Sequence, residues 1–276
     1  MPTSGEAFFA AGIAAAVELS VMQPLDVVKT QLQLRGRHAT MSGAFRSLHA
    51  TGGLIGFWRG FGPGLGIVVP RRGFKFAANE LFGRWLPGGP ASKLCAGALA
   101  GASEALIITP LEVLKVQMQS QSTQSHQSVH ATARALWARA GVASFYTGLG
   151  ATVIKHSAHS MVYFGAFQGA QPAARSAMRS HVRGDLVAGF VAGVAAGTVN
   201  NPFDVLKTRL QAGAHRELRA LRQQQQHAGV AKGIAHILRV EGMMALFYGW
   251  TAKVARLGPG SALIFAVYHS ILERLE

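Results

Sequence analysis

Three short motifs place a proline, an acidic residue and a basic residue at the same spacing along the chain. They read Pro24-Leu-Asp26-Val-Val-Lys29, Pro110-Leu-Glu112-Val-Leu-Lys115 and Pro202-Phe-Asp204-Val-Leu-Lys207. A repeat of this period indicates one structural unit that occurs three times in the fold. Around a threefold axis, the three acids and three bases would meet in a ring of ion pairs.

The composition is more apolar than that of an ordinary soluble domain. Of the 276 residues, 49% are hydrophobic and 14% are charged, and the mean hydropathy is +0.23. The formal net charge of +15 is compatible with nucleic acid, an anionic membrane surface or an anionic substrate as partner. Many bases lie inside or at the ends of apolar segments, which favours membrane and substrate and argues against nucleic acid.

Six apolar segments are expected to form long helices, and several reach the roughly 20 residues that span a bilayer. They cover residues 7–34, 64–86, 92–119, 150–171, 184–211 and 252–273. A short amphipathic helix and an aromatic-glycine element separate the two segments of each repeat, and the polar run 223–226 reads as a solvated loop. The predicted fold is therefore an all-α membrane protein with repeats at 1–90, 91–182 and 183–276.

The triplicated proline motif and the aromatic-glycine elements resemble the mitochondrial carrier family over essentially the whole chain. This resemblance implies a barrel of six tilted helices that shuttles solutes across the inner mitochondrial membrane, as a multi-pass and monomeric protein. It implies a gate on the matrix side, in which Asp26, Glu112 and Asp204 pair with Lys115, Lys207 and Lys29, braced by Gln31 and Gln117. We expect these pairs to be water-accessible and weak, about 0–1 kcal/mol each. Cardiolipin is the anionic lipid expected around such a carrier.

Several bases lie in the middle of apolar segments, where a charge is costly and indicates function. The predicted substrate-binding residues are the bases Arg71, Lys75, Lys155, His156 and Arg256, with Glu18 and Glu104 as counter-ions. Arginine binds carboxylates through two parallel hydrogen bonds and lysine adds a point charge, so a polyvalent anion is the expected ligand. Alternatively, some of these bases extend to lipid headgroups or pair internally.

The stretches around Glu18, Glu104, Lys155 and Arg256 are most similar to the branch of the family that exchanges 2-oxoadipate and 2-oxoglutarate. The alternatives within transport are citrate, another dicarboxylate or a nucleotide. A soluble helical-repeat protein, or a carrier fold without transport, are competing interpretations of a different class. No catalytic pair, cofactor motif or metal-ligand spacing is apparent, and the single cysteine, Cys95, excludes a disulfide framework.

Overall fold

The computed structural model describes residues 4–35, 40–86, 89–120, 128–178, 181–212 and 216–275. Within these ranges the chain forms helices and no strand, which confirms the predicted all-α fold. The helices are α1 (Ser4–Arg35), α2 (Met41–Gly52), α3 (Phe61–Trp85), α4 (Pro90–Ser120), α5 (Val129–Ala140), α6 (Leu149–Ala177), α7 (His181–Val199), α8 (Asn201–Ala212), α9 (Arg216–Glu241) and α10 (Trp250–Leu275). Short 3-10 turns, η2 (Ile55–Trp58), η3 (Gly141–Tyr146) and η4 (Met243–Phe247), precede α3, α6 and α10.

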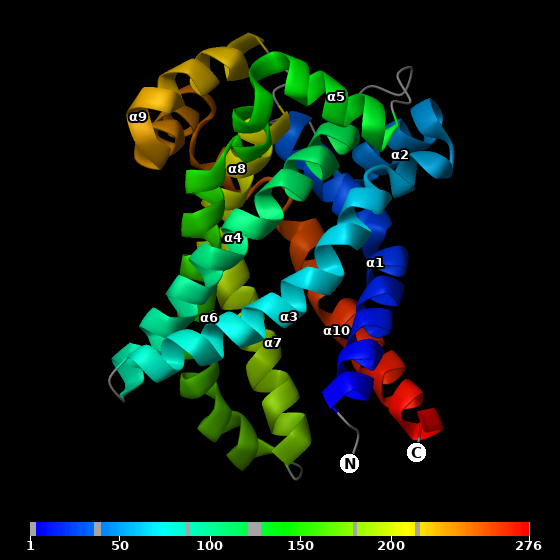
Figure 1. Ribbon diagram of the computed structural model, residues 1–276, viewed down its shortest axis with the longest axis vertical. Helices are drawn as coiled ribbons and strands as arrows, with labels where there is room; N and C mark the ends of the chain where they lie inside the picture. The colour runs from blue at the N-terminus through cyan, green and yellow to red at the C-terminus, as the bar shows by residue number, and fades with distance from the viewer. Residues whose placement is uncertain are drawn as a thin grey trace.

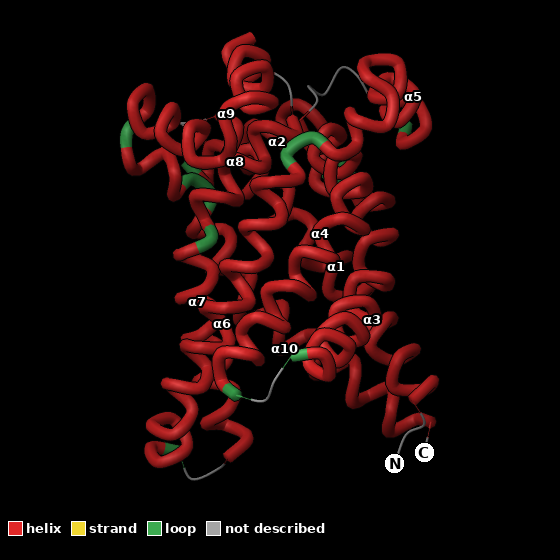
Figure 2. Tube along the Cα trace, turned by 60° about the vertical axis from the view of Figure 1, so that its left-hand side comes forward, coloured by secondary structure: helices red, strands yellow, loops and turns green. Residues whose placement is uncertain are grey.

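The long helices run between two ends of the molecule. Helices α2, α5 and α9 lie at one end, and both termini lie at the other (Figures 1 and 2). In repeats one and two, a long helix that carries the proline motif is followed by a shorter helix and a second long helix. In repeat three, α7 and α8 take the place of the first long helix, and α9 has 26 residues with the non-helical Gly229 inside it. All six predicted apolar segments are helical, and the fifth is divided between α7 and α8.

The motif proline has a different effect in the third repeat. Pro24 and Pro110 lie inside continuous helices, whereas the helix of the third repeat breaks before Pro202, and α7 and α8 meet at a bend of 55°. Proline removes a backbone hydrogen bond and crowds the preceding turn, which favours a kink. The adjacent Asn200 and Asn201 favour non-helical backbone, so the kink becomes a break here.

A glycine in the left-handed region begins the second long helix of each repeat and packs against the next repeat. Its φ angle is +72° at Gly60, +77° at Gly148 and +77° at Gly249. An added Cβ atom would lie 2.9 Å from the Lys115 carbonyl oxygen at Gly60, 3.5 Å from the Gln211 side chain at Gly148, and 3.0 Å from the Lys29 carbonyl oxygen at Gly249. These contacts join repeat one to two, two to three, and three to one, which closes the barrel.

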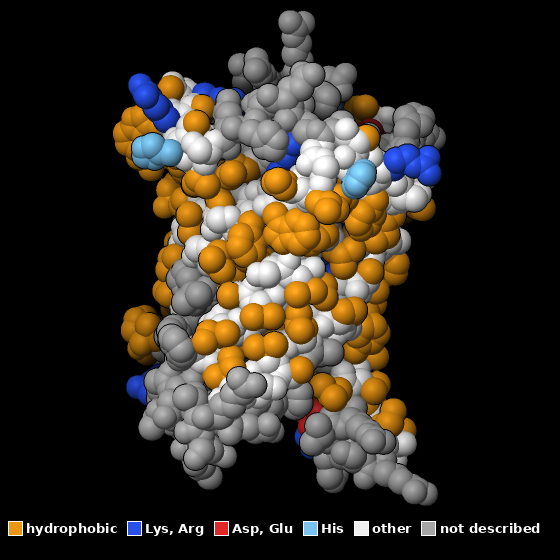
Figure 3. Space-filling model, turned by 90° about the vertical axis from the view of Figure 1, so that its right-hand side faces the viewer, with side chains coloured by type: hydrophobic (Ala, Val, Ile, Leu, Met, Phe, Trp, Pro, Cys, Tyr) orange, Lys and Arg blue, Asp and Glu red, His pale blue; other side chains and the backbone are white. Residues whose placement is uncertain are grey.

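The outer surface is suited to lipid. Apolar side chains cover the middle of the face in Figure 3, and lysine, arginine and histidine side chains appear mainly towards its ends. In the part of the chain that the structure describes, residues 10–34 alone have the length and hydropathy of a membrane span, and α7 with α8 meets that criterion as a bent pair.

One expectation about the third repeat is wrong. Residues 223–226 lie within helix α9 and do not form a loop. Glutamine is a good helix former, so a polar run of glutamines is compatible with a helix. The non-helical residue is Gly229, at φ 74°, where α9 kinks before its final turns.

Candidate functional site

The three motif acids and the three motif lysines form a ring of ion pairs between neighbouring repeats. The Lys Nζ atom lies 2.9 Å from the carboxylate in Lys115–Asp26, 2.6 Å in Lys207–Glu112 and 2.5 Å in Lys29–Asp204. Each motif supplies its acid to one neighbouring repeat and its lysine to the other. The structure therefore brings together the six residues that the sequence predicts to pair.

These ion pairs are more buried than we expected from the sequence. Only 4% of the Asp204 side chain and 6% of the Lys207 side chain are exposed. Removing one partner of a buried pair leaves an uncompensated charge and typically costs about 3–5 kcal/mol. Lys29 and Lys115 keep 20% and 18% of their side chains exposed, and all six residues line a cavity, so the acids and Lys207 are the buried part of the ring. The expected strength of about 0–1 kcal/mol for each pair stays a prediction.

The residue two positions after each motif lysine donates a side-chain hydrogen bond to a backbone carbonyl of a neighbouring repeat. Gln31 donates to the Gln119 carbonyl at 2.6 Å, and Gln117 donates to the Gln211 carbonyl at 2.6 Å. In the third repeat Arg209 takes the place of glutamine and donates to the Gln33 carbonyl at 2.9 Å. The predicted braces Gln31 and Gln117 thus hold adjacent repeats together through backbone carbonyls.

The sequence analysis missed one glutamine in each repeat, which lies four residues after the motif lysine. Thr30 donates to the side chain of Gln119 at 2.7 Å, and Thr208 donates to Gln33 at 2.7 Å. Gln33, Gln119 and Gln211 are all buried. These glutamines recur at the same position of all three repeats, and this recurrence in the sequence could have identified them.

A cavity of about 170 Å³ lies against the ring, on the side of the molecule's interior. Its walls include the six ring residues together with Lys155 of α6 and Arg256 of α10. Arg256 donates to Glu18 at 2.7 and 3.1 Å and to Asp26 at 2.5 Å, so it bridges an acid above the ring to an acid of the ring. Lys155 lies 3.1 Å from Asp204.

Two of the other predicted cavity residues, His156 and Glu104, pair with one another outside this cluster. His156 and Glu104 are both buried and face one another, with Nδ1 of the histidine 3.8 Å from Oε1 of the glutamate. Neither lines the 170 Å³ cavity. Arg71 and Lys75 belong to helix α3, but their side chains lie outside the described residues.

Sequence reasoning also missed Lys253, which lies one turn before Arg256 on α10. Its Nζ atom lies 3.3 Å from Asp204, donates to the Gly197 carbonyl at 3.0 Å, and contacts the side chain of Asn200. The spacing of three residues to Arg256 placed it on the same helix face, which was an available signal.

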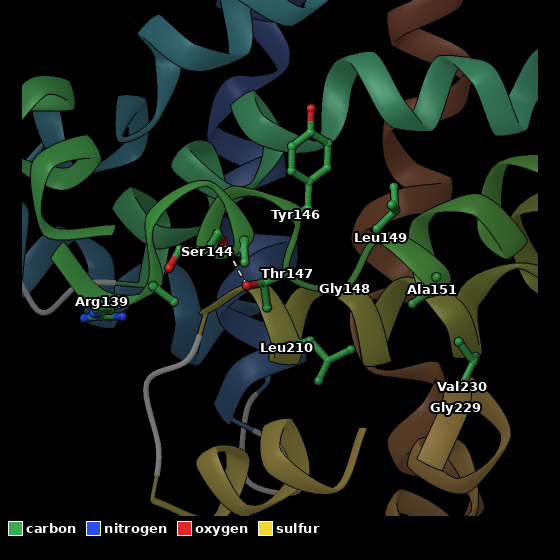
Figure 4. Close-up of a pocket in the computed structure, with 13 residues that line it drawn as sticks. Arg139, Ser144, Tyr146, Thr147, Gly148, Leu149, Ala151, Leu210, Gly229 and Val230 are labelled. Carbon is green, nitrogen blue, oxygen red and sulfur yellow. Dashed lines mark hydrogen bonds between the residues drawn. The ribbon is translucent and has the colours of Figure 1, made fainter. Parts of the chain in front are cut away.

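A second cavity, of about 430 Å³, lies between the second and third repeats at the end that carries the short helices. Figure 4 shows the residues around it: Arg139, Ser144, Tyr146, Thr147 and the start of α6 on one side, and Leu210, Gly229 and Val230 on the other. The cavity combines the N-terminus of α6 with the side chain of Arg139. The helix N-terminus attracts anions because its first backbone N–H groups have no partner within the helix. Arg139 attracts them through its positive charge.

Among the described residues, no group of three or more histidine, cysteine or acidic side chains is arranged to hold a metal ion. The charged chemistry of the interior is instead that of amines and a guanidinium facing carboxylates. Such an arrangement is chemically able to bind and release anions, since an incoming carboxylate would compete with the protein's own acids for the same donors.

Comparison with known proteins gives consistent matches along the chain. A family model described as mitochondrial carrier protein matches residues 2–90, 87–175 and 179–276. The mitochondrial 2-oxodicarboxylate carrier of Mus musculus is 33% identical, over 94% of this chain and 91% of the relative. The mitochondrial 2-oxodicarboxylate carrier 1 of Saccharomyces cerevisiae is 31% identical, over 96% and 92%. The mitochondrial citrate transporter D of Aspergillus niger is 30% identical, over 98% and 93%.

Proposed function

This chain belongs to the mitochondrial carrier family, and we propose that it exchanges 2-oxodicarboxylates such as 2-oxoadipate and 2-oxoglutarate across the inner mitochondrial membrane. The repeats 1–90, 91–182 and 183–276 would each contribute two spans to a multi-pass, monomeric carrier. Relatives named 2-oxodicarboxylate carrier in mammals and yeast support this choice of substrate.

The bridge formed by Arg256 is the observation that carries the proposal. The guanidinium holds Glu18 and Asp26 together, and thereby links the cavity to the ring. A substrate carboxylate would compete for Arg256 through two parallel hydrogen bonds and weaken its hold on Asp26. Substrate binding would thus loosen the closed ring, as alternating access requires, because the substrate interacts differently with the two states.

In this mechanism the ring is the matrix gate. When its three ion pairs are formed, the cavity is closed on the side of α2, α5 and α9. Separating buried pairs costs free energy, and the binding energy of the substrate offsets that cost. Without substrate the ring stays closed, so one anion crosses only in exchange for another.

Citrate is a second candidate substrate, because citrate transporter D of Aspergillus niger is 30% identical to this chain. Citrate carries one more carboxyl group than an oxodicarboxylate and would need a further cationic partner in the cavity.

The 430 Å³ cavity between the second and third repeats supports an anionic lipid, with cardiolipin as our proposed ligand. The N-terminus of α6 and Arg139 would face the phosphate, and the apolar residues Leu210 and Val230 would contact the acyl chains. Bound there, the lipid would join two repeats that must move relative to one another.

The proposal is tested by uptake of labelled 2-oxoglutarate into liposomes that contain the purified protein. The liposomes are loaded with 2-oxoadipate, citrate, malate or ADP, or with no counter-substrate. We expect the fastest uptake with internal 2-oxoadipate. Uptake driven by citrate or ADP, with none driven by an oxodicarboxylate, would overturn the substrate while leaving the family unchanged.

A further inference from the structure

One carboxylate of the ring, that of Asp204, contacts lysines from three different helices. Lys29 of α1 lies 2.5 Å from Oδ2, Lys155 of α6 lies 3.1 Å from Oδ1, and Lys253 of α10 lies 3.3 Å from Oδ2. Asp204 itself is 3% exposed. One negative charge cannot neutralise three ammonium groups, and their mutual repulsion is strong away from bulk water. A further anion at this point would relieve that repulsion.

The cavity as a whole has more bases than acids among the residues that the structure describes. Its walls carry the five bases Lys29, Lys115, Lys155, Lys207 and Arg256 and the three acids Asp26, Glu112 and Asp204. Glu18 and Lys253 are bonded to wall residues and add one charge of each sign. The cluster therefore keeps an excess of two positive charges, which equals the charge of a dicarboxylate dianion.

Lys253 departs from the threefold pattern. It lies four residues after Gly249, and the equivalent positions after Gly60 and Gly148 hold Gly64 and Thr152. The scaffold therefore does not require a base at this position. The ammonium group is nevertheless held in place by the Gly197 carbonyl, 3.0 Å away, at the C-terminal end of α7, where helix carbonyls attract cations.

We propose that Lys253 is a substrate-binding residue which, together with Lys155, holds one carboxylate of a dianionic substrate in place of Asp204. The second carboxylate binds Arg256, one turn away from Lys253 on the same face of α10. This inference rests on the proposed transport function. It adds Lys253 to the substrate-binding residues and gives the substrate two negative charges.

The exchange of partners couples binding to the gate. In the structure, Lys155 and Lys253 tie helices α6 and α10 to Asp204, and Arg256 ties α10 to Asp26. When the dianion takes these three bases, the two aspartates keep the ring lysines Lys29 and Lys115 as partners. Helices α6 and α10 are then released from the ring, which removes the contacts of these helices with the two aspartates and leaves the ring pairs alone to hold the gate closed.

The test compares Lys253→Gln, Lys253→Arg and the wild type in liposomes, with Lys232→Gln as the matched control. Lys232 is exposed on α9 and lines neither cavity. KM and maximal rate are measured for the dicarboxylate that the wild type transports best. Inhibition of that uptake by a 2-oxo acid with one carboxylate gives the charge selectivity, and melting temperatures show that each variant is folded.

We expect Lys253→Gln to raise KM about 10- to 100-fold, the loss expected for a charged hydrogen bond, and to reduce discrimination against the monocarboxylate. Lys253→Arg should restore most of the affinity, and Lys232→Gln should match the wild type. An unchanged KM and charge selectivity in Lys253→Gln, with a lower maximal rate or melting temperature, would show a purely structural lysine and overturn the inference. A wild type that prefers a dianion other than an oxodicarboxylate would overturn the proposed substrate alone, because the Lys253 comparison is made with the preferred dianion.

Discussion

Replacing Arg256 with glutamine removes the cation that joins the cavity to the ring of ion pairs. Asp26 keeps Lys115 as a partner at 2.9 Å, whereas Arg256 is the cation paired with Glu18 among the described side chains. Leaving a buried carboxylate unpaired costs about 3–5 kcal/mol. The Arg256 side chain is 32% exposed, so water screens part of this, and we expect a loss of about 1–3 kcal/mol.

The loss of stability and the loss of transport are separable in a double variant. A destabilisation of this size lowers the melting temperature of the detergent-purified protein by roughly 2–10 °C. Adding Glu18→Gln removes the unpaired charge and should recover most of that decrease. Exchange in liposomes should fall about 100-fold in both variants, because a charged hydrogen-bond pair to substrate, about 2–3 kcal/mol, is lost in each.

The control for this experiment is Glu18→Gln alone, which keeps Arg256 available to substrate and should retain exchange. Unchanged exchange in Arg256→Gln would remove this residue from the binding site. If the double variant were no more stable than Arg256→Gln, the unpaired carboxylate would not be the cause of the instability.

The remaining predictions concern the ring, a glycine contact and the lipid cavity. Glu112→Lys and Lys207→Glu should each abolish exchange, and the two together should restore a measurable part of it by remaking the ion pair; a double variant as inactive as either single one would contradict this pairing. Gly249→Ala should lower the melting temperature, since left-handed backbone strain costs about 1–3 kcal/mol and the new atom meets a carbonyl oxygen at 3.0 Å. Gly12→Ala, which meets no atom within 4 Å, is the control, and equal melting temperatures would refute the closure argument. Cardiolipin should raise the melting temperature more than phosphatidylcholine does, and Arg139→Gln should reduce that difference; an effect independent of Arg139 would place the lipid elsewhere.

The ring was predictable because its residues recur in all three repeats. An acid and a lysine three residues apart could also pair within one helix, so the spacing alone does not choose the partner. The pairing of Asp26 with Lys115 was predicted from the resemblance to the carrier family, and the structure shows it. The aromatic-glycine elements were also read from the sequence, because they recur in every repeat, whereas the left-handed backbone of Gly60, Gly148 and Gly249 was shown by the structure.

The contacts between side chains of different helices could not be predicted from the sequence, because they depend on how the helices pack in the assembled barrel. Lys155 and Arg256 were predicted as substrate ligands, but their contacts with Asp204 and Asp26 arise from helices distant in the sequence. Lys253 was missed because no equivalent base exists in the other repeats. The burial of the ring acids and of Lys207 was underestimated, since the residues around them belong to helices that are distant in the sequence.

The most direct test of the account is efflux of labelled 2-oxoglutarate from preloaded liposomes into buffer with and without external 2-oxoadipate. The ring of three ion pairs is expected to stay closed until a dianion takes the bases of α6 and α10. We therefore predict negligible efflux into empty buffer and rapid efflux once external 2-oxoadipate is added. Equal efflux under both conditions would contradict the central claim that substrate binding opens the gate.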